Sequence, residues 1–82
     1  MTRAEIFQAF NEIFQDVFDD DQITVHEKTT AADIPEWDSL EHINLIVAIE
    51  KRFQMRFSMA EVTGLQNVGE MVDVIQKRLA AQ

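Results

Sequence analysis

Three residues with the potential for chemistry stand together near the middle of the chain: Asp38, Ser39 and His42. Hydrolases with a Ser-His-Asp triad use these types, since histidine takes the serine proton and a carboxylate orients the imidazole. A triad also needs that carboxylate behind the imidazole and an oxyanion hole in a shaped pocket. Adjacent Asp and Ser residues on one short bundle do not readily supply this arrangement. We therefore expect no catalytic residue here, and a protein that is not an enzyme.

Metal binding is not indicated either. His26 and His42 are far apart in the sequence, and neither has a second ligand at metal-binding spacing. The acidic run at residues 19–21 lacks the alternating oxygen ligands and the closing glutamate of a calcium loop. There is no cysteine, so the chain has no thiolate ligand, disulfide or cysteine nucleophile. We expect no metal site, and a solvated acidic turn at residues 19–21.

Four capping patterns mark the helices that must position these residues. In each, a residue that favours the N-cap is followed three positions later by glutamate, as in a capping box. With apolar residues at spacings of three and four, they predict helices at about 3–18 and 39–53, a short one after residue 58 and a last one after residue 67. The pairs are Thr2 with Glu5, Asp38 with Glu41, Ser58 with Glu61, and Asn67 with Glu70.

A long connection without helical periodicity separates the first two helices. It runs from Gln22 to Trp37 and mixes β-branched residues, polar residues and Pro35. So long a connection in a small domain is usually functional or disordered. Its apolar residues, Ile23, Val25, Ile34 and Trp37, favour a loop that packs across the bundle, with Trp37 as a plug.

The helix at 39–53 has more apolar residues than one buried face requires. At about 100° per residue, Leu45, Ile49 and Phe53 fall on one side, with Ile46 beside them. Leu40, Ile43 and Val47 form a second stripe that begins next to Ser39. The helix is then either central and surrounded, or it offers the second stripe to a partner. On the second interpretation, the partner-binding residues are Leu40, Glu41, Ile43, Asn44, Val47, Glu50 and Lys51.

Composition limits the remaining classes of function. With 82 residues, 46% of them hydrophobic, the chain has room for one domain, which we place at residues 1–82. A formal net charge of −8 disfavours nucleic acid and anionic membrane surfaces and favours protein partners with basic patches. Neither a membrane span nor a signal or transit peptide is recognisable. A cytoplasmic monomer is the expectation.

The segment Asp33–Glu50, with Asp38-Ser39-Leu40 at its centre, resembles the modification site and recognition helix of the acyl carrier proteins. The resemblance continues through residues 51–53, 57–58 and 67–71, and so covers nearly the whole chain. An isolated Asp-Ser-Leu is usually only a helix start. Here the matching context identifies the chain as a carrier domain of that family, and the resemblance implies an all-α four-helix bundle with three main helices, one short helix and a long loop between the first two helices.

The resemblance implies a carrier of acyl intermediates. A phosphopantetheinyl transferase would attach 4′-phosphopantetheine from coenzyme A to Ser39, and thioesters would form on its thiol. Asp38 would be both the helix cap and part of what the transferase recognises. Further partners would be an acyl-loading ligase or transferase and synthase enzymes of a fatty acid, polyketide or related pathway, with basic and apolar docking patches. His42 would be solvated or partly packed, with contact to the arm or to a partner as a hypothesis.

Two departures from the family concern the pathway. Carriers of primary fatty-acid synthesis usually have a strongly acidic second helix preceded by a small residue. Here Glu36-Trp37 precede the motif and Lys51-Arg52 end the helix. This favours a free-standing bacterial carrier of a dedicated polyketide, lipid or aminoacyl pathway. The alternatives are an aminoacyl or peptidyl carrier, or an unmodified helical adaptor, which would tolerate Ser39→Ala.

Overall fold

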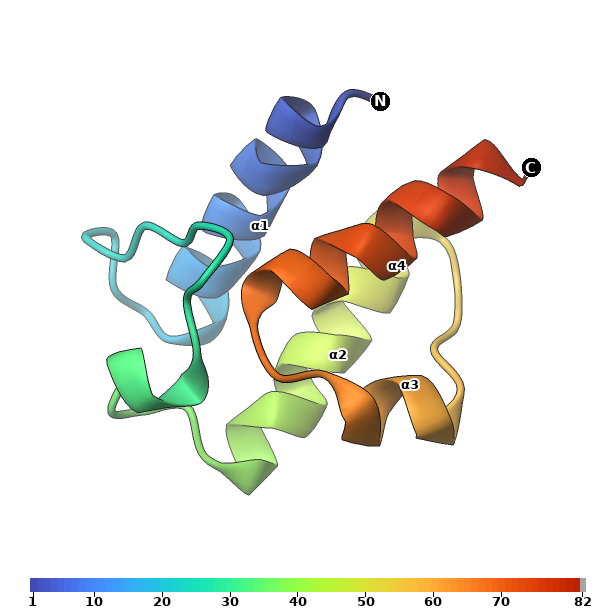
Figure 1. Cartoon of the computed structure of the whole chain (residues 1–82). Coiled ribbons are helices and arrows are strands. Elements are labelled where there is room, and N and C mark those ends of the chain that lie inside the picture. The colour runs from blue at the N-terminus through green and yellow to red at the C-terminus, as the bar shows by residue number, and fades with distance from the viewer. Residues whose placement is uncertain (82) are drawn as a thin grey trace.

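The computed structural model describes residues 1–81, which form four α-helices, one short 3₁₀ turn and no strand. The expected all-α bundle is confirmed. Figure 1 shows three long helices, α1, α2 and α4, and a short one, α3, which follows the loop that leaves α2. The helix expected at 39–53 has those bounds, and the one expected at 3–18 ends one residue earlier. The elements are α1 (Arg3–Val17), η1 (Ala31–Asp33), α2 (Ser39–Phe53), α3 (Met59–Gly64) and α4 (Val68–Ala80).

Two of the four predicted capping boxes form completely. The Thr2 hydroxyl accepts from the backbone N–H of Glu5, and the Glu5 carboxylate accepts from that of Thr2. Ser58 and Glu61 repeat both bonds at the start of α3. These bonds lower the pKa of the Glu5 and Glu61 carboxyls, because a charged acceptor makes the stronger hydrogen bond. The capping pattern therefore places both helix starts correctly.

The other two patterns place the helix start but form only half of the box. Asp38 and Asn67 accept from the backbone N–H groups of Glu41 and Glu70. The reciprocal bonds are absent, since each glutamate binds elsewhere. Glu41 accepts from the amide of Asn44, and Glu70 accepts from the backbone N–H of the residue before Asn67. Both glutamates thus have a better-placed donor than the cap backbone.

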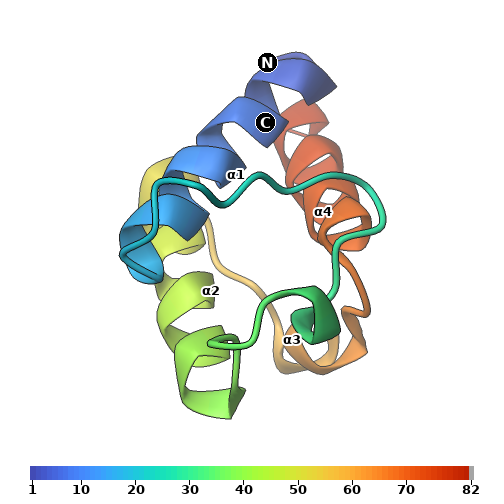
Figure 2. The ribbon, with the colours of Figure 1, turned by 90° about the vertical axis from the view of Figure 1, so that its left-hand side faces the viewer.

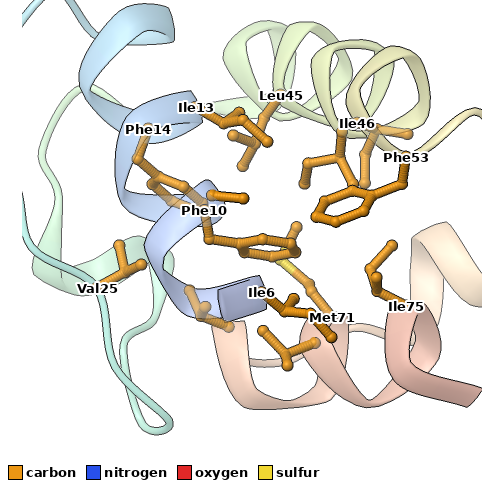
Figure 3. Packing of buried hydrophobic residues seen from close by; sticks show 14 of the residues in the cluster. Ile6, Phe10, Ile13, Phe14, Val25, Leu45, Ile46, Phe53, Met71 and Ile75 are labelled. Carbon is orange, nitrogen blue, oxygen red and sulfur yellow. The ribbon is translucent and has the colours of Figure 1, made fainter. Parts of the chain in front are cut away.

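The core lies between α1, α2 and α4, as Figure 3 shows. Their apolar faces interlock around Phe10, whose ring lies 6.3 Å from Phe14 and 6.0 Å from Phe53 between centroids. The first stripe of α2 is buried as expected. The fully buried large side chains are Ile6, Phe10, Phe14, Leu45, Ile49, Val68, Met71, Val72 and Ile75.

The loop between α1 and α2 packs against the bundle, as its apolar residues predicted, and Figure 2 shows it passing across α1 and α4. The Asn11 side chain accepts from the backbone N–H of Val25 at 2.6 Å. The first turn of α4 donates two backbone bonds to the loop: Val68 N–H to the Thr29 carbonyl at 2.8 Å, and Gly69 N–H to the Glu27 carbonyl at 2.9 Å. The loop thereby satisfies N–H groups that a helix start leaves without partners.

Arg3, the first residue of α1, joins the loop to α1 and α4. Its guanidinium donates to the carboxylates of Glu27 and Asp73 and to the side chain of Gln76. Arg3 is partly exposed, and the bond to it lowers the pKa of Glu27. The pKa of Arg3 is raised, chiefly by the same bond. One side chain thus links α1, the loop and α4.

From the sequence, Met55, Met59 and Met71 are predicted to fill the core or its edge, because methionine commonly fills gaps there, and one of the three does not. Met71 is buried and Met55 half-buried, as core or core-edge residues. Met59 was expected to be the same but is 79% exposed. It is the first residue of α3, a six-residue helix that contacts the core through the partly buried Val62, and the Met59 side chain lies outside that contact. Within residues 1–81, no helix is long and apolar enough to cross a bilayer.

Candidate functional site

Ser39 is exposed and occupies the first position of α2. Asp38 before it is the N-cap: its backbone is extended, and its carboxylate accepts from the backbone N–H of Glu41 at 2.9 Å. The Ser39 side chain is open to solvent, and its hydroxyl has no hydrogen-bond partner among the described residues. The predicted arrangement of cap and serine is confirmed.

The start of α2 has donors suited to an anion. The backbone N–H groups of Glu41 and His42 are bonded to Asp38, whereas those of Ser39 and Leu40 have no partner in residues 1–81. Free N–H groups at a helix start, with the positive end of the helix dipole, favour a negative group attached there. A phosphate on the Ser39 hydroxyl therefore fits this end of the helix.

A cavity of about 400 Å³ opens beside Ser39. It lies where η1, the start of α2 and the connection between α3 and α4 converge. Its volume falls within the range typical of small-molecule sites, roughly 300–1,000 Å³. The lining residues are Ala31, Trp37, Asp38, Ser39, His42, Leu65, Gln66, Asn67 and Met71.

His42 does not form a triad with Ser39 and Asp38. Its imidazole Nδ1 accepts a hydrogen bond from the indole Nε1–H of Trp37 at 3.0 Å, while the Asp38 carboxylate caps the helix. Trp37 is buried and packs edge-on against Phe14, with the ring centroids 5.2 Å apart at 80°. The predicted plug is confirmed, and His42 is held in place by it.

The second stripe of α2 is exposed, which rules out the interpretation that α2 is surrounded on all sides. Leu40, Ile43 and Val47 are 67%, 60% and 43% exposed. Single exposed apolar residues are common, but three in a row on one helix face form a patch. The patch begins next to Ser39.

Polar residues border this patch in two different ways. Glu41 and Asn44 are joined by a side-chain hydrogen bond of 2.9 Å at the Ser39 end. Glu50 is half-buried, and its carboxylate accepts from the backbone N–H of Phe57 at 2.8 Å. Glu50 therefore secures the chain between α2 and α3, a role the sequence did not reveal.

The far end of α2 is basic. Lys51 is exposed and, with Val47 and Arg56, lines a groove of about 470 Å³. Arg52 next to it donates to Glu12 at 3.0 Å and thus links α2 to α1. The exposed face of α2 consequently runs from acidic residues near Ser39, through apolar residues, to cations at its C-terminal end.

Sequence reasoning missed the far wall of the cavity. Leu65, Gln66 and Asn67 line it from the connection between α3 and α4. Only the Asn67 cap had been recognised, because residues in a short connection carry no periodicity that reveals which way they face. In the described part of the chain, no group of three or more His, Cys, Asp or Glu side chains is placed to hold a metal ion.

Comparison with known proteins gives a consistent result. The sequence model of the family described as "Phosphopantetheine attachment site" matches residues 8–75. A curated acyl carrier protein of Phenylobacterium zucineum (strain HLK1) is 30% identical over 78 residues, which cover 95% of this chain and 99% of that protein. An acyl carrier protein of Thermotoga maritima is 28% identical over 78 residues, covering 95% and 96%.

A solved structure is also similar. The NMR structure of a holo acyl carrier protein from Geobacter metallireducens superimposes with a TM-score of 0.86 at 44% sequence identity. The match covers 92% of this chain and 86% of the other. The two proteins are therefore similar in sequence as well as in fold.

Proposed function

Because this chain belongs to the acyl carrier protein family, whose cofactor is a covalently attached 4′-phosphopantetheine, we propose that Ser39 is the attachment residue. One observation carries this assignment: Ser39 has an unbonded, exposed hydroxyl at the start of α2, beside the 400 Å³ cavity. The only other serine in the sequence, Ser58, uses its hydroxyl to cap α3. Acyl carrier proteins are carriers and not catalysts, so the chemistry belongs to the partner enzymes.

The residues around Ser39 suit the group in distinct ways. The two unbonded N–H groups of Ser39 and Leu40 would be available to a phosphate on the Ser39 hydroxyl, and Asp38 keeps the helix start formed while its own carboxylate is engaged. When bound, the group supplies a terminal thiol that carries acyl groups as thioesters. The cavity beside Ser39 gives the attached arm a place to lie against the protein between encounters.

The attachment is tested by intact-mass measurement. The purified apo-protein is incubated with coenzyme A and a broad-specificity phosphopantetheinyl transferase. Wild type is expected to gain the mass of one arm, and Ser39→Ala none. Ser58→Ala is the matched control, since it removes the other serine and should still gain one arm. No gain by folded wild type would overturn the proposal and favour the unmodified adaptor.

We further propose that the exposed stripe of α2 is the partner-binding face, with Leu40, Ile43 and Val47 as its apolar centre. Glu41 and Asn44 would meet basic residues of a partner near Ser39, and Lys51 would meet an acidic residue at the other end. Interfaces commonly join an apolar centre to a polar rim in this way. Glu50 would affect partner binding only indirectly, because its carboxylate holds the backbone between α2 and α3.

The basic end of α2 supports a dedicated pathway over primary fatty-acid synthesis. An acidic partner surface opposite Lys51 and Arg56 would exclude docking patches that are basic throughout. The test compares turnover of the loaded carrier by fatty-acid-synthesis enzymes with turnover of their own carrier. Much slower turnover is expected, and equal turnover would refute the assignment. Residues 1–82 as one monomeric carrier domain, and its place in the cytoplasm, stay predictions.

A further inference from the structure

Trp37 and His42 form a bonded pair on the wall of the cavity beside Ser39. The indole N–H can only donate, so the imidazole Nδ1 that it contacts at 3.0 Å must accept and carries no proton. A neutral imidazole with a bare Nδ1 carries its proton on Nε2. Trp37 therefore selects the tautomer of His42.

Trp37 also fixes the orientation of the imidazole. Trp37 is 9% exposed, and its ring packs against Phe14 and Phe18, with centroids 5.2 and 6.5 Å away. The indole cannot turn without leaving this aromatic cluster. The Trp37 and His42 ring planes are inclined by only 19°, which suits a bond along the in-plane lone pair of Nδ1. The direction of the other ring nitrogen is set at the same time.

The Nε2–H of His42 has no hydrogen-bond partner within residues 1–81, although the side chain is half-buried. His42 lines the same cavity as Ser39 and lies three residues after it on α2, so their Cβ atoms are about 5–6 Å apart. A phosphate on the Ser39 hydroxyl would thus stand within reach of this donor.

We propose that His42 Nε2–H donates a hydrogen bond to the phosphate attached to Ser39 and directs the arm into the cavity, with Trp37 as the positioning residue. This rests on the proposed attachment at Ser39. A neutral donor suits the site because it has one direction, set by Trp37. The unbonded backbone N–H groups of Ser39 and Leu40 would be further donors to the same phosphate.

The experiment uses ¹⁵N-labelled protein with and without the arm, with intact mass confirming loading first. Imidazole ¹⁵N shifts report the tautomer, and the ³¹P shift reports the phosphate. His26, exposed and the only other histidine, is the internal reference. The variants are Trp37→Phe, which keeps an aromatic ring but lacks the N–H, and His42→Gln and His42→Asn, whose amides mimic Nε2 and Nδ1 respectively.

Apo wild type should show His42 as one tautomer protonated on Nε2, while His26 shows a mixture. On loading, exchange of the Nε2 proton should slow at least tenfold, equivalent to about 1.4 kcal/mol. The ³¹P shift should be kept in His42→Gln and lost in His42→Asn, and Trp37→Phe should return His42 to mixed tautomers.

A loaded protein whose Nε2 exchange equals that of the apo form would overturn the proposal, and so would one ³¹P shift common to all variants. Failure to load is a different result, visible in the mass before any spectrum is recorded. It would overturn the attachment at Ser39 itself. The two proposals therefore fail in distinguishable ways.

Discussion

Substitution of Gly69 by alanine tests how the long loop is held. Gly69 is the second residue of α4, and its N–H donates to the Glu27 carbonyl at 2.9 Å. A Cβ at this position would lie 2.7 Å from that same oxygen and 2.7 Å from the Glu27 carboxylate. The carboxylate can rotate away, but the backbone carbonyl can move only if the loop moves. In Gly69→Ala, the added methyl group on α4 would therefore clash with the backbone of the loop.

Two opposing effects decide the outcome. Alanine in a helix is favoured over glycine by about 1 kcal/mol. If the loop stays, crowding costs about 1–3 kcal/mol. If it moves away, the bonds from Val68 and Gly69 are lost, at about 0.5–1.5 kcal/mol each. On either course a cost of about 1–3 kcal/mol is set against a gain of about 1 kcal/mol, and we expect a net destabilisation of about 1 kcal/mol.

Urea unfolding followed by circular dichroism measures the effect. With a denaturant slope of about 1–3 kcal/mol/M, the midpoint for Gly69→Ala should fall by up to roughly 1 M. Gly64→Ala is the matched control, because a Cβ at Gly64 meets no atom within 4 Å. It should be neutral or more stable by up to about 1 kcal/mol. If Gly69→Ala were as stable as Gly64→Ala, the close contact would not constrain the loop.

Other substitutions test the two faces of α2 and the behaviour in acid. Ile49→Ala, in the core, should cost about 2–5 kcal/mol of unfolding free energy, whereas Ile43→Ala, on the exposed stripe, should cost less than about 0.5 kcal/mol and weaken partner turnover; equal costs would contradict the two-face assignment. The lowered pKa of Glu27 adds stability that is complete above its ordinary value of 4.5 and is lost as pH falls below it. Glu27→Gln should therefore flatten the acid limb of a stability–pH curve, and an unchanged limb would exclude the bond to Arg3 as a source of stability.

Much of the fold could be predicted because its signals are local. A cap residue followed by apolar positions three and four apart marks each helix start, and the same geometry separated the buried and exposed faces of α2. The place of Ser39 at the start of α2 could be predicted for the same reason, since Asp38, the cap, is its direct neighbour in the sequence. The turn η1, only three residues long and capped by Thr30 with Asp33, was too short to be recognised.

The contacts that could not be predicted join distant segments. The bonds from α4 to the carbonyls of Glu27 and Thr29 involve backbone groups, which every residue type carries. Similarly, the Trp37–His42 bond crosses from loop to helix, and its geometry depends on how the loop ends. The role of Glu50 as a backbone anchor also needed the path of the chain after α2. These contacts depend on how segments that are far apart in the sequence are placed against one another. The spacing of residue types along the chain does not reveal that placement.

The position of Trp37 gives the molecule a built-in optical reporter. The sequence contains one tryptophan and no tyrosine, so indole emission comes from a single, identified place. That place is a buried ring bonded to His42 at the edge of the cavity next to Ser39. Any group that enters this cavity changes the polarity around the emitter. On the isolated carrier, occupancy of the cavity can thus be followed by fluorescence without any label.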